Sequence, residues 1–193
     1  MSALTLNLSS LVDQISDTKL EALSRDNPDA RLETDCNGNL IFMPPTGSET
    51  SEKNSDLIIQ IGNWNRQYKL GKVFDSSGGF KLSNNAVRSP DVSWIPISKW
   101  NSLSKEQRRK FAPIDPDFVL ELMSPTDNLD DVQNKMKEYM NCGVRLGWLI
   151  NPDRRQVEIS RQGKNKEILD NPQTLSGEDI LPGLIVDLSE IFN

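Results

Sequence analysis

The stretch FVLELM, residues 118–123, restricts the possible folds of this chain more than any other. It is apolar almost throughout, which is typical of a strand that is covered on both faces of a sheet. Glu121 interrupts it, and an ionised carboxylate in such a strand is destabilising by several kcal/mol unless a cation, hydrogen bonds or a metal compensates its charge. The stretch therefore predicts a sheet with both faces covered and a compensating group opposite Glu121.

Amphipathic and turn patterns predict the elements around this strand. Helices are expected at residues 18–26, 51–71 and 129–141, the second capped by Gly71 and the third ended by Gly143. Strands are expected at 30–35 and 39–45 around an Asn37-Gly38 turn, within 72–84, and at 86–96, 144–150, 156–160 and 166–170. A short basic helix is expected at 104–110 and a helical turn at 186–192. This order predicts an α/β (α+β) fold with a mixed β-sheet flanked by helices.

The length of 193 residues suits one domain with a sizeable core. We expect residues 1–193 to form that single domain, with residues 1–16 as a poorly ordered N-terminal segment. No apolar run approaches the roughly 20 residues that a membrane helix needs. The start of the chain lacks the basic and apolar regions of a secretory signal. A soluble, cytoplasmic protein without a membrane partner is therefore expected.

The chain contains no histidine. This excludes Ser-His-Asp and Cys-His nucleophile systems, HExxH zinc sites and histidine-based nucleases. Cys36 and Cys142 lie far apart and outside any CxxC motif, so neither a disulfide framework nor a zinc site is indicated. Hydrolytic chemistry would have to use carboxylates, lysines and a metal such as Mg²⁺, which prefers oxygen ligands. The net charge of −6 gives no general attraction to nucleic acid.

A second acid, Asp91 in RSPDVSWIP, stands directly before a predicted strand. Strand alternation places Glu121 with Val119 and Met123 on one face, and Asp91 with Ser93 on the corresponding face of its own strand. If the two strands are neighbours, the two acids meet and repel each other unless a cation lies between them. A divalent metal is the simplest solution. The alternative is that Pro-Asp forms an ordinary turn, since both residues favour turns.

Two further acids lie near the start of the long helix predicted at 51–71, Glu49 just before it and Glu52 in its first turn. Glu49 falls at the edge of its inward stripe and Glu52 on its outer side, which favours Glu49 as a site residue. The alternative is structural, because acids at a helix N-terminus complement its dipole. Thr50 and Asn54 fall on the inward stripe, where polar groups need partners.

Five segments occur in an order that is similar to a known family. They are PTGSETSEKN, SPDVSWI, PDFVLELMSP, KMKEY and LGWLINP, which together span roughly residues 27–188. In this order they resemble the Uma-type restriction endonuclease family of the PD-(D/E)xK nuclease superfamily. The resemblance implies a restriction-endonuclease-like fold and Mg²⁺-dependent cleavage of phosphodiester bonds.

One position departs from the superfamily pattern, which would place a lysine two residues after Glu121, where this chain has Met123. Lys135 and Lys137 in the following helix could replace it, and their wheel angles do not separate them. The K-x-x-x-Y pattern of the family selects Lys135 with Tyr139. The alternative is that Lys135 only forms a buried ion pair with Glu121.

The resemblance implies a role for each candidate. Asp91 and Glu121, with the backbone carbonyl of Leu122, would hold Mg²⁺ or Mn²⁺, and Lys135 would orient the attacking water. Glu49 would ligate this metal or a second one. A basic run, Lys105 and 108–110, could contact phosphates but is more simply a solvated surface.

The resemblance implies an endonuclease that acts on nucleic acid, with DNA favoured over RNA. Two alternatives stay open: a catalytically silent nuclease fold that serves as a binding or assembly module, and a metal phosphohydrolase that acts on small phosphates. A homodimer is expected from the class, because two sites related by a two-fold axis match the symmetry of a duplex.

Overall fold

The computed structural model describes residues 3–7 and 15–193. Its larger sheet has the strand order β12-β11-β10-β9-β7-β4. In chain order these strands are β4 (Gly71–Asp75), β7 (Val92–Pro96), β9 (Phe118–Leu122), β10 (Leu146–Asn151), β11 (Gln156–Arg161) and β12 (Glu167–Asp170). Only β9 and β10 pair in parallel within this sheet, and the other pairs are antiparallel. The predicted mixed sheet is therefore confirmed, with β9 among its inner strands.

A smaller sheet has the order β1-β3-β2-β6-β5-β8. Its strands are β1 (Leu4–Leu6), β2 (Arg31–Thr34), β3 (Leu40–Met43), β5 (Phe80–Lys81), β6 (Val87–Arg88) and β8 (Ala112–Pro113). The predicted hairpin is present as the antiparallel pair of β2 and β3, with Gly38 at a φ of 78° in its turn. A further pair, β13 (Thr174–Ser176) and β14 (Ile185–Asp187), stands apart from both sheets in its hydrogen bonding.

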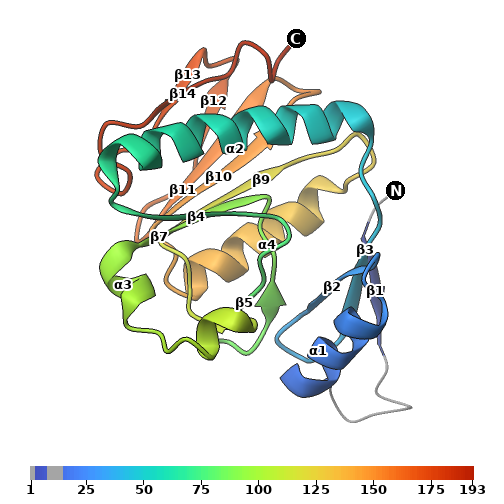
Figure 1. The fold of residues 1–193 in the computed structure, drawn as a ribbon. Helices are drawn as coiled ribbons and strands as arrows, with labels where there is room; N and C mark the ends of the chain where they lie inside the picture. Colours follow the sequence, from blue (N-terminus) through green and yellow to red (C-terminus); the bar gives the residue numbers. More distant parts are fainter. Residues whose placement is uncertain (1–2, 8–14) are drawn as a thin grey trace.

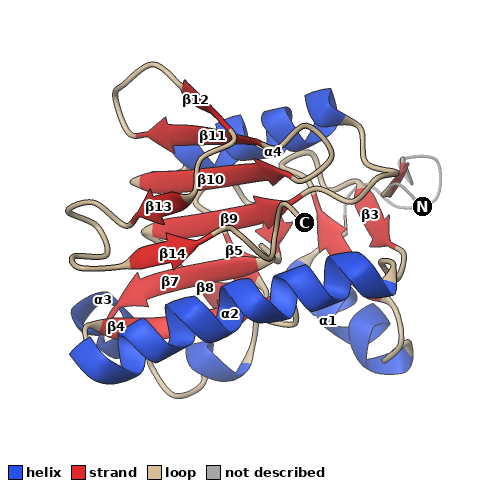
Figure 2. Ribbon diagram, turned by 90° about the horizontal axis from the view of Figure 1, so that it is seen from above, coloured by secondary structure: helices blue, strands red, loops and turns tan. Residues whose placement is uncertain are grey.

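Two long helices cover opposite faces of the larger sheet, α2 (Ser48–Tyr68) and α4 (Leu129–Asn141). Figure 1 shows α2 above the sheet and α4 below it, and Figure 2 shows α2 lying nearly along the strands on the side of β4 and β7. Strand alternation in β9 divides the core accordingly. Leu120 and Leu122 pack in the cluster that contains Leu57 of α2, whereas Val119 packs in the one that contains Met136 of α4. Glu121 therefore points toward the α4 side.

The strand predicted at 86–96 is two strands in different sheets. The chain leaves β6 of the smaller sheet at Arg88, passes through Ser89 and Pro90, and enters β7 of the larger sheet at Val92. Asp91 lies at this crossing point. The position explains why it follows a proline: proline lacks a backbone donor, so it suits a connection between two sheets.

Other elements differ in detail from the predictions. The helix α1 (Asp17–Asp26) matches its prediction, whereas α2 begins earlier than expected and ends at Tyr68. The next residue, Lys69, caps the helix with a φ of 55° and takes the left-handed role assigned to Gly71. Gly71 instead begins β4, where an added Cβ would lie 2.3 Å from the carbonyl oxygen of Ile95. The remaining short elements are α3 (Ile97–Asn101) and the 3-10 turn η1 (Gln107–Arg109), the latter within the predicted basic helix. The turn predicted at 186–192 begins inside β14.

Part of the expectation for residues 1–16 lies outside the described residues, namely 1–2 and 8–14. Leu4–Leu6 pair with Phe42, Ile41 and Leu40 of β3 and so form an edge strand. Within the described chain, every helix is too short or too polar to cross a membrane.

Candidate active site

A cavity of about 450 Å³ opens where the two sheets meet α2 and α4. We call it the acidic cavity because its lining contains seven acidic and three basic side chains. The acidic ones are Glu33, Asp35, Asp91, Glu121, Asp127, Asp131 and Glu138, and the basic ones are Arg31, Arg88 and Lys135. The excess of carboxylates creates a negative potential that favours binding of a cation.

Asp91 and Glu121 approach each other across two neighbouring strands. The register of β7 and β9 pairs Val92 with Leu120, so one further residue along each strand places Asp91 opposite Glu121. The Oδ2 atom of Asp91 accepts a hydrogen bond from the amide of Leu122 at 2.9 Å. Burial raises the pKa of the Asp91 carboxyl, while the Leu122 amide and Lys135 act against that rise.

The carboxylate of Glu121 contacts two side chains of α4, one lysine and one tyrosine. Its Oε1 atom lies 2.9 Å from Nζ of Lys135 and accepts a hydrogen bond of 2.9 Å from the hydroxyl of Tyr139. Burial raises the pKa of Glu121 to about 7, helped by the negative charges of Asp91 and Glu33 and opposed by Lys135. An acid with this pKa is partly protonated near neutral pH unless another cation joins the site.

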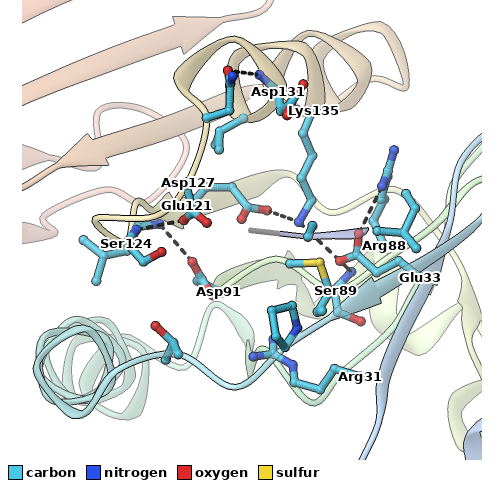
Figure 3. Close-up of a pocket in the computed structure, with 18 of the residues that line it drawn as sticks. Arg31, Glu33, Arg88, Ser89, Asp91, Glu121, Ser124, Asp127, Asp131 and Lys135 are labelled. Carbon is cyan, nitrogen blue, oxygen red and sulfur yellow. Dashed lines mark hydrogen bonds and ion pairs between the residues drawn. The ribbon is translucent and has the colours of Figure 1, made fainter. Parts of the chain in front are cut away.

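Lys135 descends from α4 into the acidic cavity and bridges two carboxylates (Figure 3). Its Nζ atom lies 2.9 Å from Oε1 of Glu121 and 3.2 Å from Oε1 of Glu33. Although burial alone would lower the pKa of Lys135, the two carboxylates raise it, so this lysine is a permanent cation. Lys137 is exposed and does not line the cavity. Its Nζ atom donates a hydrogen bond of 3.3 Å to Oδ1 of Asn134. The geometry separates the two lysines that the helical wheel left equivalent.

Met123 stands where the superfamily pattern has a lysine, but Glu121 still has a cation beside it. Its side chain is buried on the α4 side of β9, and its sulfur accepts a hydrogen bond of 3.4 Å from Asn151. The ammonium of Lys135 reaches Glu121 from the helix instead of from the strand. A lysine at position 123 is therefore not needed to place a positive charge beside Glu121.

Glu33 of β2 is a member of the site that the sequence did not suggest. Its carboxylate contacts Nη1 of Arg88 at 3.1 Å, the backbone amide of Ser89 at 2.9 Å, and Lys135. Burial alone would raise the pKa of Glu33, but Lys135 and Arg88 hold it below its usual range. Arg88 continues the network to Glu138 at 2.6 Å. No local pattern could have marked Glu33, because its partners come from β6 and α4.

Glu49 lies outside the acidic cavity. It belongs to the first turn of α2, its side chain is 76% exposed, and it pairs with Lys53 at 2.8 Å. The hydrogen bond and charge of Lys53 lower the pKa of Glu49. The structure therefore brings Asp91, Glu121, Leu122 and Lys135 together but does not bring Glu49 to them.

The inward polar residues of α2 reach the cavity in place of Glu49. Thr50 and Asn54 both line it. A hydrogen bond from the Asn54 side chain acts to lower the pKa of Asp91. The other polar atom of this side chain, Oδ1, is buried and has no hydrogen-bond partner. An unpaired buried oxygen is costly and needs a partner that donates or is positively charged.

The donor set is compatible with a hard divalent cation. Within residues 3–7 and 15–193, no group of three or more Asp, Glu, Cys or His side chains is arranged to hold a metal ion. Mg²⁺, however, is usually bound by one or two protein carboxylates, with waters and substrate phosphates as the other ligands. Asp91 and Glu121 supply two carboxylates, and the unpaired Asn54 oxygen is an available neutral donor.

Comparisons with known proteins identify the fold and the family of the chain. A solved structure of "a putative nuclease belonging to DUF820" from Anabaena variabilis superposes with a TM-score of 0.73 at 20% sequence identity, covering 85% of this chain and 90% of that one. At this identity the match establishes a shared fold and confirms the predicted restriction-endonuclease-like arrangement. A comparison with curated protein sequences gave no match. The model of the Uma2 family, described as "Putative restriction endonuclease", matches residues 17–189, and the chain therefore belongs to that family.

Proposed function

We propose that this protein is a metal-dependent endonuclease that hydrolyses phosphodiester bonds, with DNA as its substrate. The observation that carries the proposal is the pairing of β7 with β9, whose register places Asp91 opposite Glu121, with Nζ of Lys135 2.9 Å from Glu121. Two carboxylates can hold a metal that activates water for hydrolysis of a phosphodiester, and a lysine beside them can offset negative charge on the phosphate. The family membership supports the same class of reaction.

Asp91 and Glu121 would hold Mg²⁺ or Mn²⁺, together with the backbone carbonyl of Leu122. When bound, the ion would lower the pKa of a water molecule and stabilise negative charge on the phosphate. A simple Lys135–Glu121 ion pair does not account for the cavity, because Lys135 already shares its charge with Glu33 and Asp91 has no ion-pair partner among the described residues. The excess negative charge supports a cation as the missing component.

Lys135 would orient the attacking water and offset the charge that develops on the phosphate. Its ammonium is a point donor with three hydrogens, and Glu33 and Glu121 engage it from two directions. The Tyr139 hydroxyl donates to Glu121 and so fixes the orientation of that carboxylate. Glu33 and Tyr139 are positioning residues in this account, and they act through Lys135 and Glu121.

Cleavage of supercoiled plasmid, single-stranded DNA and RNA in Mg²⁺ or Mn²⁺ tests the proposal. We expect plasmid cleavage that EDTA abolishes and that Asp91→Asn and Glu121→Gln reduce by about a hundredfold or more. A model diester, bis(p-nitrophenyl) phosphate, serves as the small substrate. Cleavage of this diester without cleavage of any polynucleotide would indicate a small-molecule phosphohydrolase. A protein that cleaves none of these substrates would be a binding module.

A further inference from the structure

The acidic cavity lacks the charge needed to hold a nucleic-acid backbone by itself. Its lining has more than twice as many acidic as basic side chains, and a bound divalent cation would neutralise only part of the difference. The affinity of proteins for nucleic acids comes largely from Lys and Arg contacts with phosphates. A polynucleotide that reaches Asp91 and Glu121 therefore needs a basic surface nearby.

A second cavity, of about 480 Å³, has the opposite charge. We call it the basic cavity: its lining contains Arg25, Arg108, Arg109 and Lys110, with Glu21 as the one acid. It lies between α1, β5 and the segment 100–112, which occupy the lower half of Figure 1. In a chain with a net charge of −6, such a concentration of positive charge creates a local site for anions.

The cations of this cavity are only partly neutralised by the protein. The side chain of Arg109 is exposed and has no hydrogen-bond or ion-pair partner in the described parts of the chain. The guanidinium of Arg108 stacks over Trp100 at 5.4 Å, and its buried Nε has no hydrogen-bond partner. Lys110 reaches Glu21 only at 3.8 Å. Such groups retain donors for a phosphate oxygen.

The aromatic floor of the basic cavity holds Arg108 in place. Trp100 packs against Phe74 with ring centroids 5.0 Å apart, and Phe74 packs edge-on against Phe80 at 5.2 Å. The cation–π contact with Trp100 limits the conformational freedom of the Arg108 guanidinium. A preorganised guanidinium loses less entropy when it binds a phosphate.

The two cavities share structural elements. Arg31, which lines the acidic cavity, donates from Nη2 to the carbonyl of Ser76 at 3.0 Å, and the next residue, Ser77, lines the basic cavity. Phe80 of the basic cavity pairs across β5 and β6 with Arg88 of the acidic one. One strand pair and one loop therefore separate them, which makes the two cavities neighbours in the fold.

We propose that the basic cavity binds phosphates of the polynucleotide that flank the bond cleaved at Asp91 and Glu121. This inference rests on the proposed nuclease function and assigns to Arg108, Arg109 and Lys110 the affinity that the acidic cavity lacks. The residues contact backbone phosphates, so binding is independent of base sequence.

Fluorescence anisotropy of a labelled single-stranded oligonucleotide in EDTA tests the proposal without cleavage. The variant Arg109→Ala/Lys110→Ala removes two exposed cations from the cavity. Arg66→Ala/Lys72→Ala removes two exposed cations elsewhere and is the matched control. We expect the cavity variant to weaken binding about tenfold and to reduce the slope of log Kd against log salt by about 1.4, because each single-strand phosphate contact contributes about 0.7.

The charge-preserving variant Arg109→Lys/Lys110→Arg should retain the affinity and slope of the wild type. Equal affinity and slope for the wild type and the Arg109→Ala/Lys110→Ala variant would overturn the proposal. So would a mononucleotide or inorganic pyrophosphate that binds the cavity as tightly as the oligonucleotide, because the ligand would then be a free phosphate compound.

Cleavage assays on the same variants separate this inference from the proposed function. A raised KM for polynucleotides with an unchanged kcat in the Arg109→Ala/Lys110→Ala variant would support both. Wild-type cleavage with the same KM in this variant would overturn the inference and leave the nuclease function standing. Absence of wild-type cleavage, with binding lost in the cavity variant alone, would overturn the nuclease function and support phosphate binding by the basic cavity.

Discussion

Nζ of Lys135 lies 2.9 Å from Oε1 of Glu121, although one residue belongs to a helix and the other to a strand of the sheet that this helix covers. The contact crosses the interface between α4 and the larger sheet. It places a permanent cation beside a carboxylate whose burial raises its pKa to about 7. Catalytic groups often have pKa values shifted in this way, by burial and by a specific charged partner.

Replacement of Lys135 should separate metal binding from catalysis. Lys135→Met keeps most of the side-chain volume and removes the charge. We expect cleavage to fall by about a hundredfold or more. We also expect Mn²⁺ to bind at least about tenfold more tightly, because a nearby positive charge that repels the metal by more than about 1 kcal/mol is gone.

Lys137→Met is the control for this prediction, because Lys137 is exposed and lies outside the acidic cavity. Lys137→Met should leave both the cleavage rate and the Mn²⁺ affinity unchanged. Calorimetric titration with Mn²⁺ and plasmid cleavage measure the two effects. Weaker Mn²⁺ binding in Lys135→Met would contradict the placement of the lysine beside the cation.

The titration of Glu121 should make stability depend on pH in the absence of divalent metal. The folded protein has a pKa of about 7 at Glu121, against an ordinary value of 4.5. Between these values the folded state binds more protons than the unfolded state, so the free energy of unfolding falls as the pH rises. The loss is about 3 kcal/mol at most.

Glu121→Gln does not titrate and should lack this component. Urea unfolding in EDTA at pH 5 and pH 8 measures the free energy of unfolding of both proteins. Between pH 5 and pH 8 the free energy of unfolding of the wild type should fall relative to that of Glu121→Gln. A difference that is independent of pH would rule out the raised pKa.

Glu33 should matter for both stability and catalysis. Glu33→Gln removes the shared carboxylate of Lys135 and Arg88 and leaves buried charge with fewer partners. Loss of one partner from a buried ion pair costs about 3–5 kcal/mol. Because the amide of glutamine can still accept a hydrogen bond, we expect the free energy of unfolding to fall by about 3 kcal/mol, the lower end of this range. Because Glu33 acts through Lys135, kcat should fall more than KM changes.

Urea unfolding and steady-state cleavage check the Glu33 prediction. Glu52→Gln, on the exposed surface of α2, is the matched control and should behave as the wild type. Glu33→Asp keeps the charge and should recover part of the lost activity. If Glu33→Gln is destabilised but has the kcat of the wild type, Glu33 is structural only.

Glu49→Gln should leave Mn²⁺ binding and cleavage unchanged. Its carboxylate is exposed, pairs with Lys53 and does not line the acidic cavity. Plasmid cleavage by Glu49→Gln, measured beside Asp91→Asn, is the relevant comparison. A loss of activity similar to that of Asp91→Asn would show that the start of α2 moves toward the site when substrate binds.

The parts of the site that the sequence predicts are those that depend on local alternation. The apolar run around Glu121 and the strand after Asp91 are short and regular, so the face of each acid follows from its neighbours. The pairing of β7 and β9 meets the condition on which the predicted approach of the two acids depended, namely that their strands are neighbours. The choice of Lys135 over Lys137 was not predictable from the helical wheel, since it depends on how α4 crosses the sheet.

The remaining differences arise from contacts that are distant in sequence. Leu32 is only partly buried while Glu33 beside it is buried, because Arg88 and Lys135 supply the charges that compensate Glu33. Amphipathicity alone would favour the opposite orientation. Glu49 fell near the inward stripe of α2, but Lys53 one turn later pairs with it. Charge pairing of this kind has no hydrophobic period to reveal it.

Asp91 and Glu121 are proposed to hold one divalent cation jointly. Electron paramagnetic resonance of free Mn²⁺, titrated with the protein at pH 8, measures this binding without substrate. We predict one ion bound per chain in the wild type and at least about tenfold weaker binding in Asp91→Asn and in Glu121→Gln, since each loses a charged oxygen ligand. Equal Mn²⁺ binding by the wild type and both variants, or no binding by any of them, would contradict the claim.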